Sequence, residues 1–468
     1  MERNKYLLKN TTMIGLGSII SKFTQFVVLS LCTRCMTTSE YGIADICVST
    51  AALLFPLFSL DISESVFRFT MDKPKSYKQI ISLSICTTVL GGVIAFLFTP
   101  IAKFIPQIGD YWVMIALLSL FESLQLLAKE YARGRECGKL YVIGGVINSF
   151  AQISGCIFLV YLLTFGIWGY IVSLCFGYVA EFLFFAFAMD FKKNFSFFSI
   201  EKNYSKDMFS YSLPLIPNTI MWWIAAISDR YFILYMIGAS AAGLYSVAAK
   251  IPALITIVTG IFFKAWQMSA IDIKKQKDKQ TYSSNIFKYL WIVGAIGIAI
   301  ILILLQPILF FLVAEDYYDA WIYSTILIVA AGFASIQSFF GTSYTVQKDS
   351  IGCLKSTSFM ALLNLFLNYV LIRLLGIQGA ALATLLSYMF ISIYRYIDTK
   401  KYIKISIDFG RFFCTYALLI ISAIIPLINL KLFYPASILS LILIVLINRS
   451  AISFIFQMIK SIIAKRIR

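Results

Sequence analysis

Residues 291–313 read WIVGAIGIAIILILLQPILFFLV and contain no charged side chain. About 20 apolar residues are enough for a helix to cross the hydrocarbon core of a bilayer. Because such stretches recur along the chain, we predict membrane-spanning helices over residues 10–34, 42–69, 79–103, 111–132, 140–165, 167–189, 207–233, 241–268, 284–312, 321–346, 355–375, 377–397, 409–430 and 433–455.

The composition supports the same fold class. Of the 468 residues, 60% are hydrophobic and 13% are charged, whereas a typical soluble protein has about 25% charged residues. A soluble core of this size cannot bury so much apolar surface, so soluble enzymes, nucleic-acid-binding proteins and secreted proteins are excluded. We expect an all-α polytopic membrane protein with about 14 transmembrane helices.

The net charge of +17 follows the expected topology. Most of the 40 Lys and Arg residues fall in alternate connections and in the two tails, whereas the opposite connections hold only Arg34, Lys103 and Lys431. Positively charged connections remain in the cytoplasm. We therefore predict a multi-pass protein of the bacterial inner (plasma) membrane with both termini in the cytoplasm, and no nucleic-acid partner.

An internal echo divides the chain into two halves. The sequence Gly-Ile-Trp-Gly at 166–169 recurs as Gly-Ile-Gln-Gly at 376–379, and a weaker echo joins Gly42 to Gly243. Both echoes link helices of the same orientation, as parallel repeats do. We predict two six-helix lobes around a central cavity, with two extra C-terminal helices. The expected parts are an N-terminal lobe at 1–189, a cytoplasmic linker at 190–206, a C-terminal lobe at 207–397, and the last two helices with a basic cytoplasmic tail at 398–468.

Several kinds of chemistry lack the residues that they need. The chain has no His and no phosphate-binding Gly-rich loop followed by Lys and Ser or Thr. Cys32 and Cys35 form a C-x-x-C pair without a second ligand pair, so we interpret them as packing residues. We expect a transporter rather than an enzyme, with no catalytic residue, no metal and no cofactor. Its energy would come from a proton or sodium gradient or from the membrane potential.

Basic residues inside the predicted helices are the first candidates for a binding site, because charges are costly at bilayer depth. Lys22 lies near the middle of the first span and shares a small, polar stripe with Gln25. Lys250 lies on a similar face of the eighth span and is followed closely by Pro252. Each lysine either contacts a substrate or pairs with an interior carboxylate.

Further polar residues fall on the seventh span and on other helices. Asn218, Asp229 and Arg230 lie on the seventh span, and Arg230 and Asp229 either serve the site or pair at its outer end. Glu122 and Glu181 lie deeper, where each is a candidate ion-coupling site or the neutralising partner of a lysine. The remaining polar groups are interpreted as structural: an ion pair between Glu64 and Arg68 near Asp61, and interhelical contacts from Asn364 and Asn368.

At the seventh span the sequence resembles polysaccharide (O-antigen) flippases of the multidrug/oligosaccharidyl-lipid/polysaccharide exporter superfamily. The resemblance extends over nearly the whole chain in short stretches of matching order. These stretches are Lys9-Asn-Thr11, Arg34-Cys-Met-Thr-Thr-Ser-Glu-Tyr-Gly42, Tyr211-Ser-Leu-Pro-Leu-Ile-Pro217, Ser228-Asp-Arg230, Gly243-Leu-Tyr-Ser-Val-Ala-Ala-Lys-Ile-Pro252, Phe263-Lys-Ala-Trp266, Tyr318-Asp-Ala-Trp321, Asn364 to Asn368 and Gly376-Ile-Gln-Gly-Ala-Ala-Leu-Ala-Thr384.

The resemblance implies export of an undecaprenyl-pyrophosphate-linked oligosaccharide, an O-antigen or capsular repeat unit, from the cytoplasmic to the periplasmic leaflet. It implies that Lys22 and Lys250 serve the anionic headgroup, and it implies membrane lipid, a polysaccharide polymerase and a chain-length regulator as partners. Two alternatives remain open at this point. A drug or metabolite cation antiporter of the same superfamily would share the fold but favour an acidic cavity, and a membrane glycosyltransferase would need a large catalytic domain.

Overall fold

The computed structural model describes residues 23–72, 77–272, 278–347, 349–454 and 457. Within these residues every regular element is helical, so the predicted all-α fold is confirmed. Among the described residues, eleven helices are long and apolar enough to cross a membrane, or up to twelve if the bent pair Ala239–Ala248 and Ala253–Gly260 forms one span. The predicted first and seventh spans correspond to the shorter apolar helix Phe23–Cys35 and to the helix Ile216–Met236.

The chain forms two compact units. Unit 1 comprises Met1–Leu244 and Leu312–Tyr317, and unit 2 comprises Tyr245–Phe311 and Tyr318–Arg468. The first unit extends to residue 244 because the helix at 216–236 packs against the helix at 38–58 through buried polar contacts described below. The division into two lobes joined by a linker at 190–206 stays a prediction.

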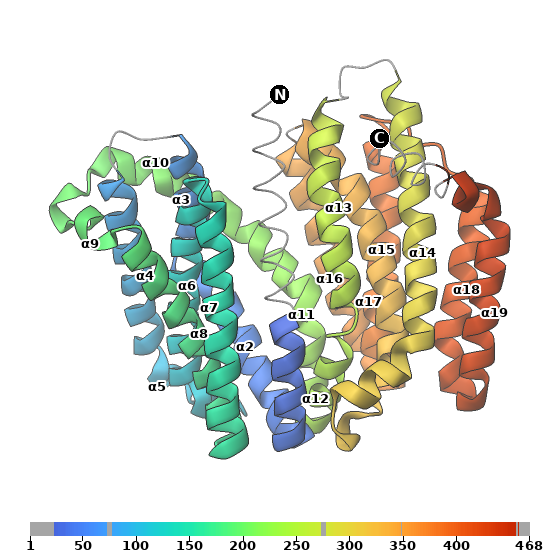
Figure 1. Cartoon of the computed structure of the whole chain (residues 1–468), viewed down its shortest axis with the longest axis horizontal. Coiled ribbons are helices and arrows are strands. Elements are labelled where there is room, and N and C mark those ends of the chain that lie inside the picture. The colour runs from blue at the N-terminus through green and yellow to red at the C-terminus, as the bar shows by residue number, and fades with distance from the viewer. Residues whose placement is uncertain (1–22, 73–76, 273–277, 348, 455–456, 458–468) are drawn as a thin grey trace, which may run out of the picture. The chain divides into compact units, whose positions relative to one another are not determined.

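Unit 1 is a bundle of helices that begins with the first described residues (blue to green in Figure 1). Thr37 starts α2 with a capping box, since its hydroxyl accepts the Glu40 N–H while the Glu40 carboxylate accepts the Thr37 N–H. Asp61 has a positive φ of 49°, which breaks the predicted span 42–69 into α2 and α3. The main helices are α2 (Thr38–Phe58), α3 (Ile62–Met71), α4 (Lys78–Leu97), α6 (Trp112–Gly134), α7 (Gly138–Cys156), α8 (Gly166–Ala188), α10 (Lys202–Ser212) and α11 (Ile216–Met236).

Unit 2 is built around α15, whose side chains are buried along most of its length. Helices α13, α17 and α18 pack against α15, and α16 packs against α17. The helices of this unit are α13 (Ala253–Asp272), α14 (Lys279–Leu312), α15 (Ala320–Gln347), α16 (Ser350–Leu375), α17 (Ile377–Thr399), α18 (Phe409–Ile428) and α19 (Phe433–Ile447). The short helix α12 (Ala239–Ala248) connects the two units in sequence.

The two glycine turns that echo each other in sequence both contain a glycine with positive φ. Gly166 and Gly376 have φ values of +52° and +61°, which a residue with a side chain rarely adopts. Three residues later, Gly169 packs against the backbone carbonyl of Leu159, and Gly379 packs against that of Leu371. Each turn thus joins two antiparallel helices closely, one pair in each unit.

The second echo corresponds to a direct contact within unit 1. Gly42 of α2 lies against the backbone of Ala239 and Gly243, and Gly243 lies against the carbonyl of Thr38. The hydroxyls of Thr38 and Ser240 are 2.7 Å apart. The contact is reciprocal: each glycine lies against the residue that precedes the other glycine by four positions, Gly42 against Ala239 and Gly243 against Thr38. Two segments related by a two-fold axis make contacts of this kind.

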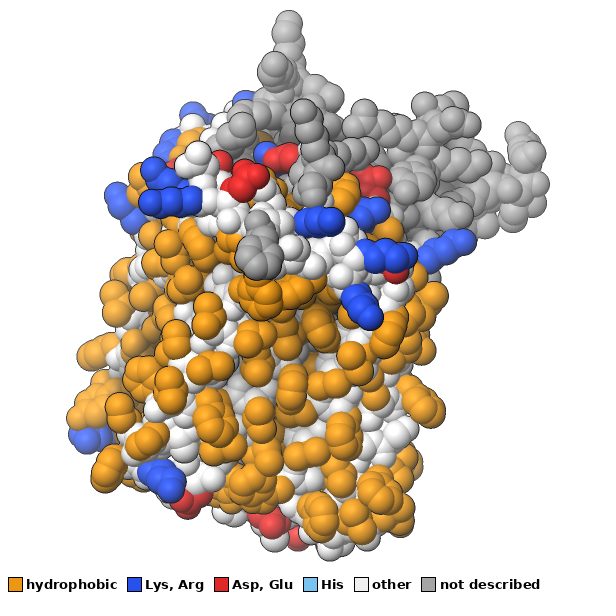
Figure 2. All heavy atoms as spheres, turned by 90° about the vertical axis from the view of Figure 1, so that its left-hand side faces the viewer, with side chains coloured by type: hydrophobic (Ala, Val, Ile, Leu, Met, Phe, Trp, Pro, Cys, Tyr) orange, Lys and Arg blue, Asp and Glu red, His pale blue; other side chains and the backbone are white. Residues whose placement is uncertain are grey.

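The surface separates apolar and charged side chains. On the face shown in Figure 2, hydrophobic side chains cover a broad band, and most Lys and Arg side chains gather at one end of it. This is the distribution expected of a bilayer-spanning protein whose basic connections lie on one side. That this side is the cytoplasm stays a prediction.

Candidate functional site

A buried ion pair lies between α6 and α8 of unit 1. The Lys129 ammonium is 3.4 Å from the carboxylate of Glu181, whose side chain is fully buried. The same carboxylate accepts hydrogen bonds from the side-chain amides of Gln125 (2.6 Å) and Asn148 (2.7 Å). The Glu181 carboxylate thus has one cation and two amide donors around it inside the bundle, as a buried polar group requires.

Sequence spacing and glycine residues bring these groups together. Gln125 and Lys129 are one turn apart on α6, so both side chains reach the same face of α8. Gly144 of α7 lets that helix approach, because a Cβ at this position would meet the Phe185 ring and lie 3.3 Å from the Glu181 carboxylate. Lys129 lies inside the predicted span 111–132 but was not singled out from the sequence; the structure places it within α6, which extends to Gly134.

Glu122 lies one turn before Gln125 on α6, and its side chain is half-buried. No hydrogen bond or ion pair joins it to another residue in the part of the chain that the structure describes. Tyr178 of α8 lies within electrostatic range of both Glu122 and Glu181. The two carboxylates that sequence analysis treated alike thus differ, since Glu181 has a cationic partner and Glu122 has none among the described residues.

A second ion pair joins α2 and α11. The Arg230 guanidinium donates to the Asp45 carboxylate at 2.8 Å and to the Ser49 hydroxyl at 3.2 Å. Asp45 is 2% exposed and was not singled out from the sequence. Asp229 is also buried, and its carboxylate accepts the backbone N–H of Arg230 at 2.9 Å. The partner of the Arg230 guanidinium in the described structure is thus Asp45 of α2, whereas the sequence suggested Asp229, and its role in a substrate site stays a prediction.

Three further hydrogen bonds hold α11 against α2 and against Asp61, which lies between α2 and α3. The Trp223 indole donates to the Ser49 carbonyl, the Tyr231 and Thr50 hydroxyls are 2.7 Å apart, and the Thr219 hydroxyl donates to Asp61. Asn218 lies one residue before Thr219, and its side-chain oxygen is buried without a hydrogen-bond partner among the described residues. These contacts explain why α11 belongs to unit 1.

The residues expected to bind the anionic headgroup are placed only in part. Lys22 lies outside the described residues, and its neighbour Gln25 is exposed on the helix Phe23–Cys35. Lys250 lies in the break between α12 and α13, where its side chain is half-buried. Its backbone N–H donates to Val247 and its carbonyl accepts from Ala253, so the helix is interrupted next to Pro252 as predicted.

A buried arginine in unit 2 lies inside the predicted span 377–397 but was not singled out from the sequence. Arg395 of α17 is 2% exposed. Its guanidinium donates to the Gln337 side chain at 2.6 Å, to the Ser356 hydroxyl at 2.9 Å and to the Thr357 hydroxyl at 3.2 Å. Gly341 makes room for it, because a Cβ there would lie 2.6 Å from the guanidinium. This cation has only neutral hydrogen-bond acceptors among the described residues and ties α15, α16 and α17 together.

The other polar predictions have mixed outcomes. Asn364 donates to the Ser387 hydroxyl of α17 at 3.4 Å, so its interhelical role is confirmed, whereas Asn368 donates to Asn364 at 2.9 Å within α16. The predicted Glu64–Arg68 pair is wrong. Arg68 instead pairs with Asp72 at 3.5 Å, because both side chains lie at the exposed end of α3.

Cys32 of the C-x-x-C pair packs against a neighbouring helix. Cys32 is buried with its sulfur 3.7 Å from that of Cys156 on α7. In the described part of the chain, no group of three or more Cys, Asp and Glu side chains has the arrangement of a metal site.

Comparison with known proteins identifies the family. Residues 7–267 match the family of polysaccharide biosynthesis proteins. The chain belongs to this family. It is 23% identical over 436 residues to an uncharacterised membrane protein of Methanocaldococcus jannaschii, and the match covers 85% of this chain and 99% of that protein.

Solved structures of the MOP superfamily share the fold of this polysaccharide biosynthesis protein. An inward-facing multidrug-resistance MATE-family transporter of that superfamily matches with a TM-score of 0.70 at 13% identity, covering 81% of this chain and 94% of the transporter. A MOP-superfamily transporter from Pyrococcus furiosus, for which the reverse polarity of the binding pocket suggests a different function, matches with a TM-score of 0.60 at 14% identity, covering 85% and 95%. The family match and the likeness of fold together describe a multi-pass membrane protein of this family with the fold of MOP-superfamily transporters.

Proposed function

We propose that this transporter is a flippase that moves an undecaprenyl-pyrophosphate-linked oligosaccharide from the cytoplasmic to the periplasmic leaflet by alternating access. The observation that carries the proposal is the match of residues 7–267 to polysaccharide biosynthesis proteins on a chain with a transporter fold. Polysaccharide synthesis at a membrane needs its lipid-linked units on the far side, and a transporter of this family supplies that step without chemistry on the sugar. An O-antigen or capsular repeat unit is the proposed cargo.

The charges inside the two units favour an anionic substrate over a cationic one. Within unit 1 the buried carboxylates of Asp45 and Glu181 are each paired with a basic side chain. A cationic drug would have to displace those partners. Unit 2 buries Arg395 among neutral acceptors and carries Lys250 at a helix break. The solved MOP-superfamily transporter from Pyrococcus furiosus has a binding pocket of reverse polarity. This fold can therefore carry binding pockets of different polarity.

Lys22 and Lys250 are the proposed contacts of the pyrophosphate, with Arg230, Gln25 and Asn218 as further substrate contacts. Two ammonium groups at bilayer depth are costly unless an anion neutralises them. Arg230 would contribute once the substrate competes with Asp45 for its guanidinium. Lys→Arg at position 22 or 250 should keep substantial flipping, because the charge is retained although the geometry changes.

The membrane potential can drive this export without ATP. A potential of about 100 mV is worth roughly 2.3 kcal/mol per elementary charge, so two negative charges moving outward gain roughly 4.6 kcal/mol. Coupling to a proton or sodium gradient would add to this. Glu122, Glu181 and Asp229 are the proposed ion-coupling candidates, and Glu122 fits best because the structure gives Glu181 a fixed cationic partner.

The coupling proposal is tested with Glu122→Gln and Glu181→Gln in proteoliposomes under an imposed pH gradient. If Glu122 exchanges protons, its amide variant loses pH-driven flipping but keeps flipping driven by membrane potential. Unchanged pH-driven transport in both variants would remove these two carboxylates from the coupling mechanism.

The cation antiporter of the same superfamily is the alternative function. Complementation of a flippase-deficient strain, together with drug accumulation in the same cells, separates the two. We expect restored surface polysaccharide and unchanged drug accumulation. Reduced drug accumulation without surface polysaccharide would instead support the antiporter. A polymerase and a chain-length regulator are the proposed protein partners downstream of the flippase.

A further inference from the structure

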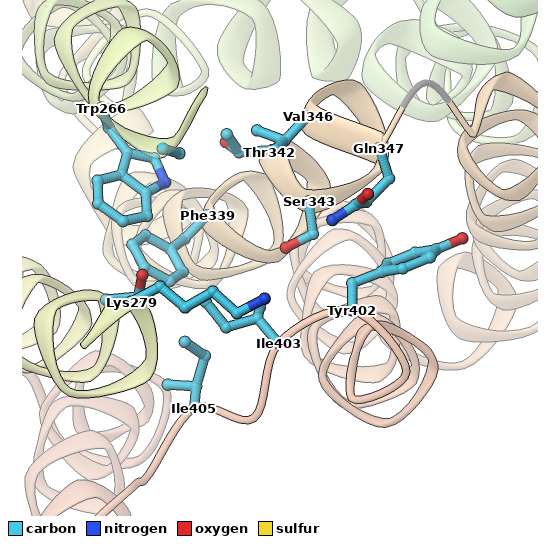
Figure 3. Close-up of a pocket in the computed structure, with 12 residues that line it drawn as sticks. Trp266, Lys279, Phe339, Thr342, Ser343, Val346, Gln347, Tyr402, Ile403 and Ile405 are labelled. Carbon is cyan, nitrogen blue, oxygen red and sulfur yellow. The ribbon is translucent and has the colours of Figure 1, made fainter. Parts of the chain in front are cut away.

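A small pocket lies at one end of unit 2, away from the proposed Lys22 and Lys250 site. It is enclosed by the C-terminal ends of α13 and α15, the first turns of α14, and the segment that follows α17 (Figure 3). Its cavity volume is about 40 Å³, several times the roughly 10–15 Å³ that a single water needs. The polar side chains that line it are Trp266, Lys279, Ser283, Thr342, Ser343, Gln347 and Tyr402.

Two of these polar groups are buried and lack hydrogen-bond partners among the described residues. They are the indole nitrogen of Trp266, whose side chain is 6% exposed, and the hydroxyl of Ser283. The indole ring is held by stacking on Phe339, with ring centroids 4.8 Å apart. The direction of its N–H is therefore fixed toward the pocket (Figure 3). A buried donor without an acceptor costs free energy, so an acceptor belonging to a ligand is expected there.

The remaining polar groups also suit an anion. Figure 3 shows the Lys279 ammonium and the Ser343 hydroxyl directed into the same space, opposite Trp266. No Asp or Glu belongs to the described lining of this pocket. The nearby Asp349 is occupied elsewhere, since its carboxylate accepts the Tyr402 hydroxyl at 2.6 Å and the Gly352 N–H at 2.8 Å. These hydrogen bonds hold the pKa of Asp349 below its usual range, so it remains an acceptor for them.

We propose that this pocket binds a phosphate group. An indole N–H and an ammonium donate but cannot accept, and the serine hydroxyls can turn to donate as well. Hydrogen bonds from such donors to an ionised oxygen are stronger than those to a neutral one, which selects an oxyanion over a sugar hydroxyl. Lys279 and Gln347 are half-exposed, so the pocket is open to a ligand from the adjoining surface. The proposal does not rest on flipping, because binding is measured without transport.

The test measures binding of inorganic phosphate to the full-length protein in phosphatidylcholine nanodiscs, at constant ionic strength set with chloride. Calorimetric titration gives the Kd, and thermal unfolding gives the accompanying stabilisation. Lys279→Gln should raise the Kd by about tenfold or more, because it removes the charged donor. The matched control is Lys288→Gln, which changes a lysine of the same helix outside this pocket and should leave the Kd unchanged.

Two further variants separate loss of a donor from loss of folding. Trp266→Phe keeps the stacked ring and removes the N–H, and Ser343→Ala removes one hydroxyl. Each should weaken phosphate binding several-fold while the ligand-free unfolding temperature stays near that of the parent. Absence of stabilisation of the parent protein by inorganic phosphate and by geranyl diphosphate alike would overturn the proposal. So would equal Kd values for Lys279→Gln and Lys288→Gln.

The source of the phosphate is resolved by comparing inorganic phosphate with geranyl diphosphate, a short prenyl diphosphate. Binding of geranyl diphosphate alone, lost in Lys279→Gln, identifies the headgroup of a prenyl-linked lipid. Equal binding of both, again lost in Lys279→Gln, identifies a site for free phosphate or for any phosphate monoester. Binding of neither contradicts the proposal, and normal flipping by such a protein would leave the flippase function intact.

Discussion

Replacing Glu181 by Gln tests whether the interior of unit 1 depends on a buried charge. The carboxylate has the Lys129 ammonium at 3.4 Å and two amide donors at 2.6 and 2.7 Å. A glutamine keeps one acceptor oxygen but places an NH₂ group against donors, and it leaves Lys129 without its counter-ion. Removal of one partner from a fully buried pair costs about 3–5 kcal/mol. Because the Lys129 side chain is 19% exposed, water compensates in part and we expect about 2–3 kcal/mol.

The assay is equilibrium unfolding in mixed detergent micelles with increasing SDS, followed by tryptophan fluorescence. Glu122→Gln is the matched control, because it makes the same chemical change on a half-buried carboxylate without an ion pair among the described residues. We expect its effect to stay within about 1 kcal/mol. The double variant Lys129→Met with Glu181→Gln should be more stable than the sum of the single variants predicts, by about 1–3 kcal/mol.

Two results would refute this reasoning. One is a change in unfolding free energy below about 0.5 kcal/mol for Glu181→Gln, the level of an uncoupled surface change. The other is strict additivity of the Lys129 and Glu181 variants, since additivity is the behaviour of residues that do not interact.

Three other predictions concern packing, the second buried cation and topology. Gly243→Ala should destabilise the protein by about 1–3 kcal/mol, because the added Cβ would meet the Thr38 carbonyl. The control is Gly260→Ala, since a Cβ at Gly260 would enter open space. Equal losses of stability in the two variants would contradict the packing argument. Arg395→Lys should cost about 2–4 kcal/mol in thermal or SDS unfolding, since an ammonium cannot reach Gln337, Ser356 and Thr357 together, and an unchanged unfolding curve would contradict this. Reporter fusions after Lys206 and after Arg468 should both report a cytoplasmic location, and a periplasmic signal at either would refute the predicted topology.

The helices were predictable because hydrophobic length is a local property of the sequence. The predicted spans 167–189 and 377–397 differ from α8 and α17 by at most two residues at either end. The turns at Gly166 and Gly376 were also located correctly, since a positive φ at a short connection favours glycine. These features depend only on neighbours in the chain.

The buried polar network was less accessible to sequence reasoning. The predicted spans 111–132 and 377–397 contain Lys129 and Arg395, but both residues lie near the ends of their spans, where a basic residue has the same composition signal as one in a cytoplasmic loop. Asp45 and Arg230 are 185 residues apart, and a single sequence contains no information on which helices pack together. The Glu64–Arg68 prediction failed for a different reason: both spacings, to Glu64 and to Asp72, are four residues, so local geometry alone did not choose between them.

The proposed function is tested most directly by flipping of a fluorescent undecaprenyl-pyrophosphate-linked oligosaccharide in proteoliposomes that contain the purified protein. Variants at positions 22 and 250 are compared at equal protein abundance and with a membrane potential imposed. We predict transport by the parent protein, substantial transport by Lys22→Arg and Lys250→Arg, and no transport by Lys22→Glu or Lys250→Glu, because a carboxylate repels the pyrophosphate. Normal flipping by both well-folded Glu variants would contradict the site assignment, and absence of flipping by the parent protein would contradict the function itself.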